Sequence, residues 1–249
     1  MDRLLAETPD LAEDQFGLQC ALFDLGAVKA VLSTDPSLAT RTFGPRGPLV
    51  HLAFSKHLKA HPELENDMLA IAELLIANGA DVNDGYPVYP GSDHMLSALY
   101  GAIGHADNMA LGQWLLENGA DPNDGESLYH ATELAHHEGL RLLLKFGADP
   151  KGTNALLRAM DFDDVEAVRM PLQAGAEADE FNGTHVGGER PWVIPALHQA
   201  ARRMSSREMI DELLDAGADP PRVFEGGSAY AYGRVFGNAT LAQAIEVRG

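Results

Sequence analysis

Histidine and carboxylate side chains are the groups of this chain that could do acid–base or metal chemistry. There are ten histidines and 37 aspartates and glutamates. The densest group is His136-His137-Glu138, but adjacent residues on a helix point in different directions. His94 and His185 lie in loop-like segments and have no companions at the spacing of metal ligands. We therefore expect no metal site.

The motifs of covalent catalysis and nucleotide binding are missing from the sequence. It has no phosphate-binding loop, no Cys–His pair and no nucleophile elbow. The carboxylates Asp163 and Asp164 fit a solvated turn before a helix, where negative charge is favourable. The single cysteine, Cys20, excludes an intramolecular disulfide framework and fits a reducing compartment. We expect a cytoplasmic protein that is not an enzyme and binds no cofactor.

The charge balance narrows the class of partner. With 37 acidic against 18 basic residues, the net charge is −19. Phosphate contacts need clustered Lys and Arg, so we expect no binding to nucleic acid or to an anionic membrane surface. No apolar run is long enough to span a bilayer. The acidity permits electrostatic steering toward a basic partner; alternatively, it only keeps the protein soluble.

An apolar run that ends in Gly-Ala-Asp recurs along the chain, and it indicates that helices position the histidine and carboxylate side chains. The glycines of its five copies are Gly79, Gly119, Gly147, Gly175 and Gly217, and the fourth copy has Glu in place of Asp. A helix that ends at such a glycine needs a left-handed conformation there. The copies recur at intervals of 40, 28, 28 and 42 residues. This repetition predicts a stacked array in which each helix packs against its neighbours.

The sequence resembles the ankyrin repeat family over nearly its whole length. Pro48-Leu49-Val50-His51-Leu52-Ala53 and Pro195-Ala196-Leu197-His198 come close to the Thr-Pro-Leu-His-x-Ala phrase of that family. The resemblance implies an all-α solenoid of helix pairs with hairpin-like fingers. It would contain about six to seven repeats in one domain, residues 1–249. It also implies that His51 and His198 hydrogen-bond neighbouring backbone instead of binding a ligand.

Two irregularities interrupt the repeats. Residues 54–65 add about ten residues between the helices of the second repeat, which we interpret as a longer first helix and a bent connector. Pro171 falls within the second helix of the fifth repeat, which ends in the fourth Gly-Ala phrase, and an interior proline is costly there. We expect that helix to kink or to start late.

The connections between repeats differ in length. The 28-residue intervals have shortened fingers, whereas those at about 84–96 and 180–193 are enlarged and rich in Gly and Pro. Tyr86 and Tyr89 lie in the first long finger, Phe181 and Trp192 in the second. Aromatic side chains on loops of a rigid scaffold are typical of binding hot spots. Alternatively, the rings fold back and cover the loop's own apolar side. Long fingers on either side of short ones would form a cradle.

The resemblance places partner contacts on these fingers and on the concave face formed by the inner helices. The candidates on the fingers are Tyr86, Tyr89, Asp93, His94, Phe181, His185, Glu189, Arg190 and Trp192. The candidates on inner helices or at their ends are Tyr100, His105, Tyr129, Glu133, Asp161, Arg202 and Arg203, and by the repeat register Arg158 belongs to the same helices.

These features favour a monomeric protein–protein interaction module that catalyses no reaction. A sharper hypothesis is an acidic intracellular inhibitor or immunity-type protein that neutralises a basic partner. The alternative is a passive scaffold or adaptor with several weaker partners. A small-molecule binder would need an enclosed pocket with convergent polar groups, which a solenoid seldom supplies.

Overall fold

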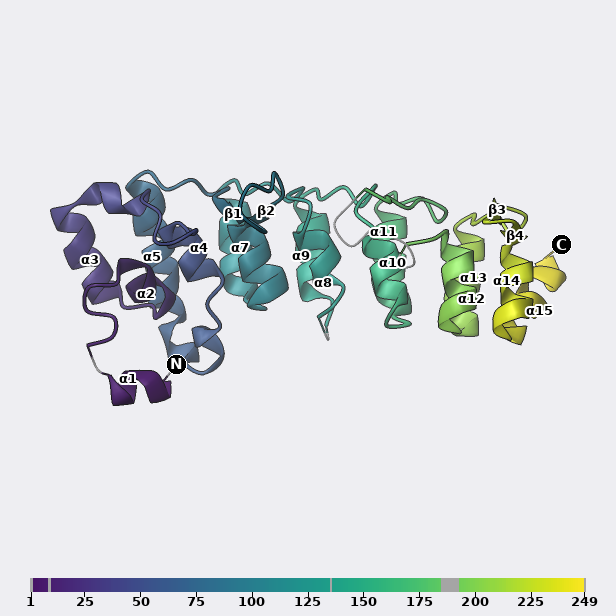
Figure 1. Cartoon of the computed structure of the whole chain (residues 1–249), viewed down its shortest axis with the longest axis horizontal. Helices are drawn as coiled ribbons and strands as arrows, with labels where there is room; N and C mark the ends of the chain where they lie inside the picture. The colour runs from purple at the N-terminus through teal and green to yellow at the C-terminus, as the bar shows by residue number, and fades with distance from the viewer. Residues whose placement is uncertain (1, 9, 135, 185–192, 249) are drawn as a thin grey trace. The chain divides into compact units, whose positions relative to one another are not determined.

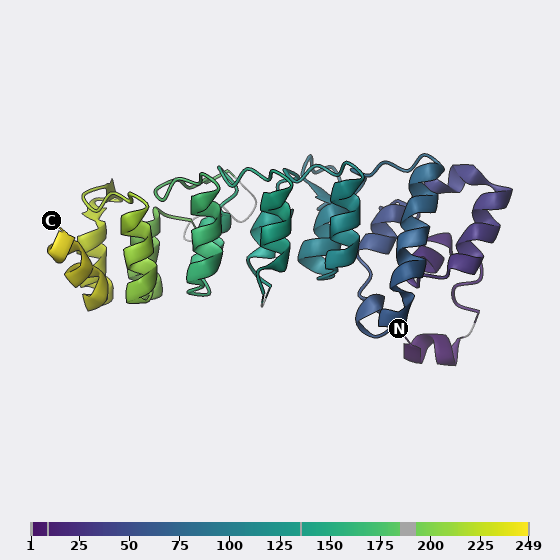
Figure 2. The same ribbon diagram turned by 180° about the vertical axis from the view of Figure 1, so that it is seen from behind.

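The computed structural model describes residues 2–8, 10–134, 136–184 and 193–248. The chain divides into two compact units, unit 1 (Met1–Ser127) and unit 2 (Leu128–Gly249). Each unit is built from pairs of short antiparallel helices that lie side by side (Figures 1 and 2). We call the first helix of each pair inner and the second outer. No helix in the described ranges has both the length and the apolar character needed to cross a membrane.

Unit 1 begins with a short separate helix and continues with three helix pairs. Its elements are α1 (Asp2–Glu7), α2 (Phe16–Ala21), α3 (Leu25–Thr34), η1 (Pro36–Ala39), α4 (Pro48–Ala53), η2 (His57–Lys59), η3 (Pro62–Leu64), α5 (Glu65–Ala77), β1 (Gly85–Pro87), β2 (Met95–Ser97), α6 (Ala98–Tyr100), the π-helical turn η4 (Gly101–His105) and α7 (Met109–Glu117). The inner helix α4 packs against the inner helices α2 and α6, and the outer helix α5 packs against α3 and α7.

Unit 2 repeats this packing with four helix pairs. Its elements are α8 (Ser127–Ala131), which starts at the last residue of unit 1, then α9 (Glu138–Lys145), α10 (Ala155–Met160), α11 (Val165–Gln173), α12 (Ala196–Arg203), α13 (Arg207–Asp215), β3 (Val223–Phe224), β4 (Gly227–Ser228), α14 (Ala229–Phe236) and α15 (Ala239–Arg248). The inner helix α12 packs against α10 and α14, and the outer helix α13 against α11 and α15. The predicted all-α fold with six to seven repeats is therefore confirmed, with seven pairs in the described residues.

The glycine of each repeated phrase ends its outer helix as expected. All five glycines have φ between 90° and 104°, which only glycine adopts without strain. In each copy the alanine after the glycine donates to the carbonyl five residues back, as from Ala80 N to Leu75 O at 3.0 Å. This bond is the long bond of a Schellman motif. In unit 1 the acceptor side chains Leu75 and Leu115 are fully buried, so helix end and core are specified together.

Pro171 replaces the leucine that occupies this acceptor position in the other four copies. The expectation of a late start is wrong, because α11 begins at Val165, where the Asp164 side chain caps the amide of Ala167 at 3.0 Å. The helix continues through Pro171 to Gln173. Pro171 is buried, and its carbonyl still accepts the Schellman bond from Ala176 at 2.9 Å.

The insertion in the second repeat does not lengthen the first helix. The inner helix α4 ends at Ala53, and the following residues form the two short 3-10 turns η2 and η3 before α5 begins. The bent connector is therefore confirmed and the longer helix is wrong. Pro62 starts η3, and a proline cannot donate the backbone bond that would continue a preceding helix.

The first long finger is a β-hairpin. Tyr86 of β1 pairs with Leu96 of β2, and the amide of Val88 donates to the carbonyl of His94 at 3.0 Å. A second, shorter hairpin joins β3 and β4 in unit 2. In three of the four complete phrases the aspartate starts the finger turn, because its side chain accepts from the amide two residues on, as Asp81 does from Asn83 at 2.9 Å. After Asp219 that position is Pro221, which has no amide N–H.

Candidate functional site

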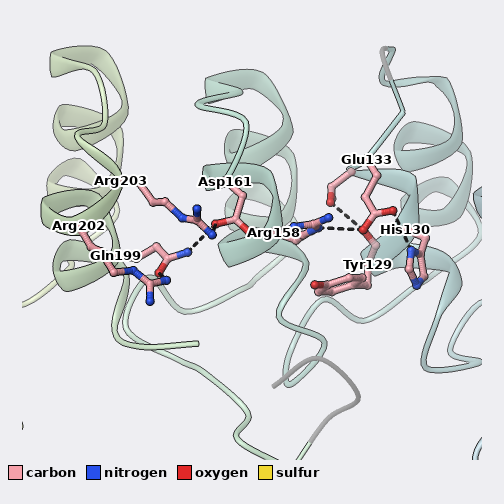
Figure 3. A network of polar contacts seen from close by, with 9 residues as sticks. Tyr129, His130, Glu133, Arg158, Asp161, Gln199, Arg202 and Arg203 are labelled. Carbon is pink, nitrogen blue, oxygen red and sulfur yellow. Dashed lines mark hydrogen bonds and ion pairs between the residues drawn. The ribbon is translucent and has the colours of Figure 1, made fainter. Parts of the chain in front are cut away.

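Side chains from three successive inner helices of unit 2 point toward one another and form one polar network (Figure 3). We call it the arginine network, and its members are Tyr129, His130, Glu133, Arg158, Asp161, Gln199, Arg202 and Arg203. Glu133 Oε1 accepts from Arg158 Nε at 2.8 Å. Arg158 also donates from Nη1 to Asp161 Oδ2 at 3.0 Å. Asp161 Oδ1 lies 2.7 Å from Arg203 Nη2, so negative and positive charges alternate along the row from Glu133 to Arg203.

Gln199 extends the arginine network on α12. Its Nε2 donates to Asp161 Oδ1 at 2.8 Å, and its Oε1 accepts from Arg202 Nη2 at 2.6 Å. Gln199 is fully buried, whereas Arg203 is exposed. The arginine network therefore has an anchored inner part and an outer edge of guanidinium groups that a partner can reach.

The repeat register explains why these residues meet. Glu133, Asp161 and Arg203 each precede the glycine of their own repeat by the same number of residues. Stacked repeats bring equivalent positions of neighbouring helices together. Sequence register therefore selects the correct row of side chains before any contact is known.

The charges shift the titration of the network residues. Burial raises the pKa of the Glu133 carboxyl, but the His130 ring and the Arg158 guanidinium outweigh this effect and hold the pKa below its ordinary value. Burial, and then the neighbouring Arg203 guanidinium, lower the pKa of Arg202.

The shift at Glu133 predicts how unit 2 responds to acid. Because its pKa in the folded state is below the ordinary 4.5, its contribution to stability is complete above that pH and is lost as pH falls through the folded-state value. We expect the urea midpoint of unit 2 to fall below pH 4.5 less steeply in Glu133→Gln than in the wild type. Circular dichroism at several pH values measures this. The exposed Glu177 provides the control Glu177→Gln, and identical slopes in all three proteins would contradict the prediction.

Two large apolar side chains lie at the edge of the arginine network. Phe162 and Met204 occupy equivalent positions at the ends of α10 and α12 and are 53% and 56% exposed. The Arg158 guanidinium carbon lies 5.0 Å from the centroid of the Phe162 ring, within the range of a cation–π interaction. Exposed apolar groups beside ordered arginines have the composition of protein-binding hot spots.

The predicted partner-binding residues of unit 1 do not all face solvent. The Tyr86 hydroxyl accepts a hydrogen bond from Arg46 Nη2 at 2.7 Å, and its ring packs edge-on against Phe54. Tyr100 and His105 also contact Phe54, with ring centroids 5.7 and 5.2 Å away. Tyr86 therefore follows the alternative expectation for the finger aromatics: its ring folds back against the protein and supports the base of the finger.

The remaining finger candidates have different environments. Tyr89 is 65% exposed at the hairpin tip, close to the exposed Asp93. Nε2 of His94 lies 2.7 Å from Oε1 of the buried Glu126, close enough for an ion pair when the ring is protonated. The Phe181 ring packs edge-on against Phe224 at 5.7 Å. The candidates His185, Glu189, Arg190 and Trp192 lie outside the described residues.

The histidines of the Pro-Leu-His phrases have the predicted backbone contacts. His51 Nε2 lies 2.9 Å from the Phe43 carbonyl, and His198 Nε2 lies 3.1 Å from the Gly227 carbonyl. Within the described ranges, no group of three or more His, Cys, Asp and Glu side chains could hold a metal ion.

Two members of the arginine network, His130 and Gln199, were not among the residues that the sequence places on this face. They precede Glu133 and Arg202 by three residues each. Residues three apart are neighbours on a helix, so this spacing was the available signal.

Compared by sequence, the chain matches no family model and no curated protein. Compared by structure, it is similar to the ankyrin repeat domain of human ASB11, with a TM-score of 0.67 and 23% identity over 95% of this chain and 98% of that one. It is also similar to an ankyrin repeat domain from Acinetobacter baumannii, with a TM-score of 0.58 and 23% identity over 76% and 97%. For the ankyrin repeat domain of Bcl-3 the TM-score is 0.65 and the identity 19% over 94% and 97%. These similarities show the fold.

Proposed function

We propose that this ankyrin-repeat protein binds another protein on the inner-helix surface of unit 2. Ankyrin-repeat domains generally mediate protein–protein interactions and are typically non-enzymatic. The observation that carries the proposal is the arginine network with Phe162 and Met204 exposed at its edge. Its inner part is pre-ordered by Asp161 and Gln199, which reduces the side-chain entropy lost on binding.

A finer proposal concerns the partner's charge. The net charge of −19 would accelerate encounter with a basic protein and make the association rate depend on salt. The arginine network itself contains three guanidinium groups and two carboxylates, so this attraction would come from acidic side chains elsewhere on the chain. We therefore propose, as the finer version, that the protein acts in the cytoplasm as an inhibitor of one basic protein. This version uses both the net negative charge for encounter and the arginine network for contact.

Affinity capture from a lysate of the source organism, at low and at high salt, tests the proposal with three proteins. These are the wild type, the double variant Phe162→Ala/Met204→Ala, and Val247→Ala as a control. Val247 is 77% exposed on the outer helix α15. We expect the wild type and the control to capture the same protein and the double variant to lose at least tenfold in affinity, since hot-spot truncations cost about 2 kcal/mol or more.

The salt series separates the alternatives. One basic protein whose capture weakens with salt supports the inhibitor form. Several partners that bind the double variant as well as the wild type would favour a passive scaffold and contradict the site on unit 2. Capture of no protein at all would contradict the protein-binding function.

A further inference from the structure

Unit 1 contains a pocket of about 450 Å³, which lies within the range of small-molecule sites. One wall is the connector between α4 and α5, so the pocket exists because of the insertion at residues 54–65. We call it the basic pocket, because five of its ten lining residues have basic side chains: Arg46, His51, Lys56, His57 and His105. None of the ten, all within the described part of the chain, is acidic.

Two of these side chains, Arg46 and Lys56, carry fixed positive charges that no carboxylate of the described residues pairs with. Arg46 is stacked 4.8 Å from the centroid of the Phe54 ring and 4.3 Å from that of Tyr86. It donates one bond to the Tyr86 hydroxyl, a neutral partner. Within the described ranges, neither Arg46 nor the exposed Lys56 forms an ion pair with a carboxylate. Lys59, three residues further on, does pair with Asp107 at 3.0 Å.

The electrostatic environment of His105 supports this description. Burial lowers the pKa of His105 below its ordinary value, and the positive charges of Lys56 and Arg46 lower it further. No carboxylate acts on the ring in the opposite direction. Arg46 and Lys56 therefore act on the same histidine ring, in a chain with about twice as many acidic as basic residues.

We propose that the basic pocket binds a small organic phosphate monoester. A phosphate monoester carries nearly two negative charges at neutral pH and three strong acceptor oxygens, which match the two fixed cations Arg46 and Lys56. Arg and Lys are the usual phosphate ligands in proteins. Ala21, Leu22, Ala60 and the Phe54 ring complete the lining and would hold the organic part. This proposal does not depend on the proposed function, because every lining residue lies in unit 1.

Phenyl phosphate is the probe that tests the proposal on the full chain by isothermal titration calorimetry. We expect 1:1 binding that weakens about tenfold in Lys56→Gln, since a hydrogen bond to a charged group contributes roughly 1.5 kcal/mol or more. Lys56 is exposed and has no ion pair, so the variant should fold, and circular dichroism checks this. The control Lys29→Gln makes the same charge change on the exposed face of α3 in the same unit and should bind as the wild type does.

Three other ligands test which features of phenyl phosphate the basic pocket recognises. Inorganic phosphate should bind more weakly than phenyl phosphate, and equal affinity would overturn the role of the apolar lining. Benzoate binding as tightly as phenyl phosphate would overturn the preference for a dianion. A phosphotyrosine peptide that binds more tightly than phenyl phosphate would overturn the assignment to a small molecule. No binding of phenyl phosphate at millimolar concentration, or equal binding by Lys56→Gln and the wild type, would overturn the site.

Discussion

Replacing Asp161 with alanine should lower the free energy of unfolding of unit 2 by about 3 kcal/mol, because several donors lose their acceptor at once. The Asp161 side chain is only 10% exposed and contacts Arg158 and Arg203. It also accepts from the amide of the fully buried Gln199. Arg158 keeps Glu133 as a partner. Gln199 would keep a buried N–H without an acceptor, and this desolvation makes up a large part of the expected loss.

Urea unfolding followed by circular dichroism measures this loss, and hydrogen exchange of amides in α10 and α12 localises it to unit 2. Asp161→Asn keeps one acceptor oxygen and should have an intermediate stability. Asp215→Ala is the control, because within the residues that the structure describes Asp215 pairs with Arg248 alone, and its side chain is 69% exposed. Exposed ion pairs contribute little. If Asp161→Ala were as stable as Asp215→Ala, the arginine network would not contribute to the fold of unit 2.

The repeats were predictable because one short phrase encodes both a helix end and a core position. Gly79 and its four equivalents specify the left-handed turn, and in four of the five copies a leucine four residues earlier specifies the buried contact. Both features are local, so they can be recognised in a sequence without knowledge of the partners. The same local logic placed Glu133, Asp161 and Arg203 in one row of inner helices.

The orientation of the finger aromatics was not predictable in this way. Tyr86 turns inward because Arg46 and Phe54 provide a guanidinium donor and a ring edge. These partners precede it in the sequence by more than thirty residues and belong to the previous repeat. Tyr89, three residues after Tyr86, remains 65% exposed. Composition alone assigns both tyrosines to the finger. It cannot distinguish a ring that packs against the protein from one that is exposed to a partner.

The basic pocket was missed for a related reason. Its walls come from α2, α4, the connector that follows α4, and η4, so its charges are scattered over the sequence among a large excess of acidic residues. A whole-chain charge of −19 indicates an acidic protein and says nothing about a local cluster. The expectation that a solenoid seldom supplies a pocket also neglected the insertion that forms one wall.

Replacing Pro171 with leucine should raise the free energy of unfolding of unit 2 by about 2 kcal/mol, because an interior helical proline costs roughly 3 kcal/mol. The variant regains an N–H that can donate to the carbonyl of Ala167, four residues earlier in α11. It also restores the residue type of Leu143 and Leu213, which are fully buried at the equivalent positions of α9 and α13. Part of the gain is offset by the greater freedom of leucine in the unfolded chain.

Two further variants separate the causes of this stabilisation. Pro171→Ala restores the backbone donor but not the leucine volume, so its gain isolates the hydrogen bond. Pro221→Leu makes the same substitution at an exposed turn position of unit 2, where no helical bond is regained and no stabilisation is expected. Urea unfolding and hydrogen exchange of α11 measure all three. If Pro171→Leu were less stable than the wild type, the core around α11 would be adapted to the smaller ring. The fifth repeat would then differ from its neighbours in packing as well as in sequence, because filling a tightly packed site with extra volume is itself destabilising.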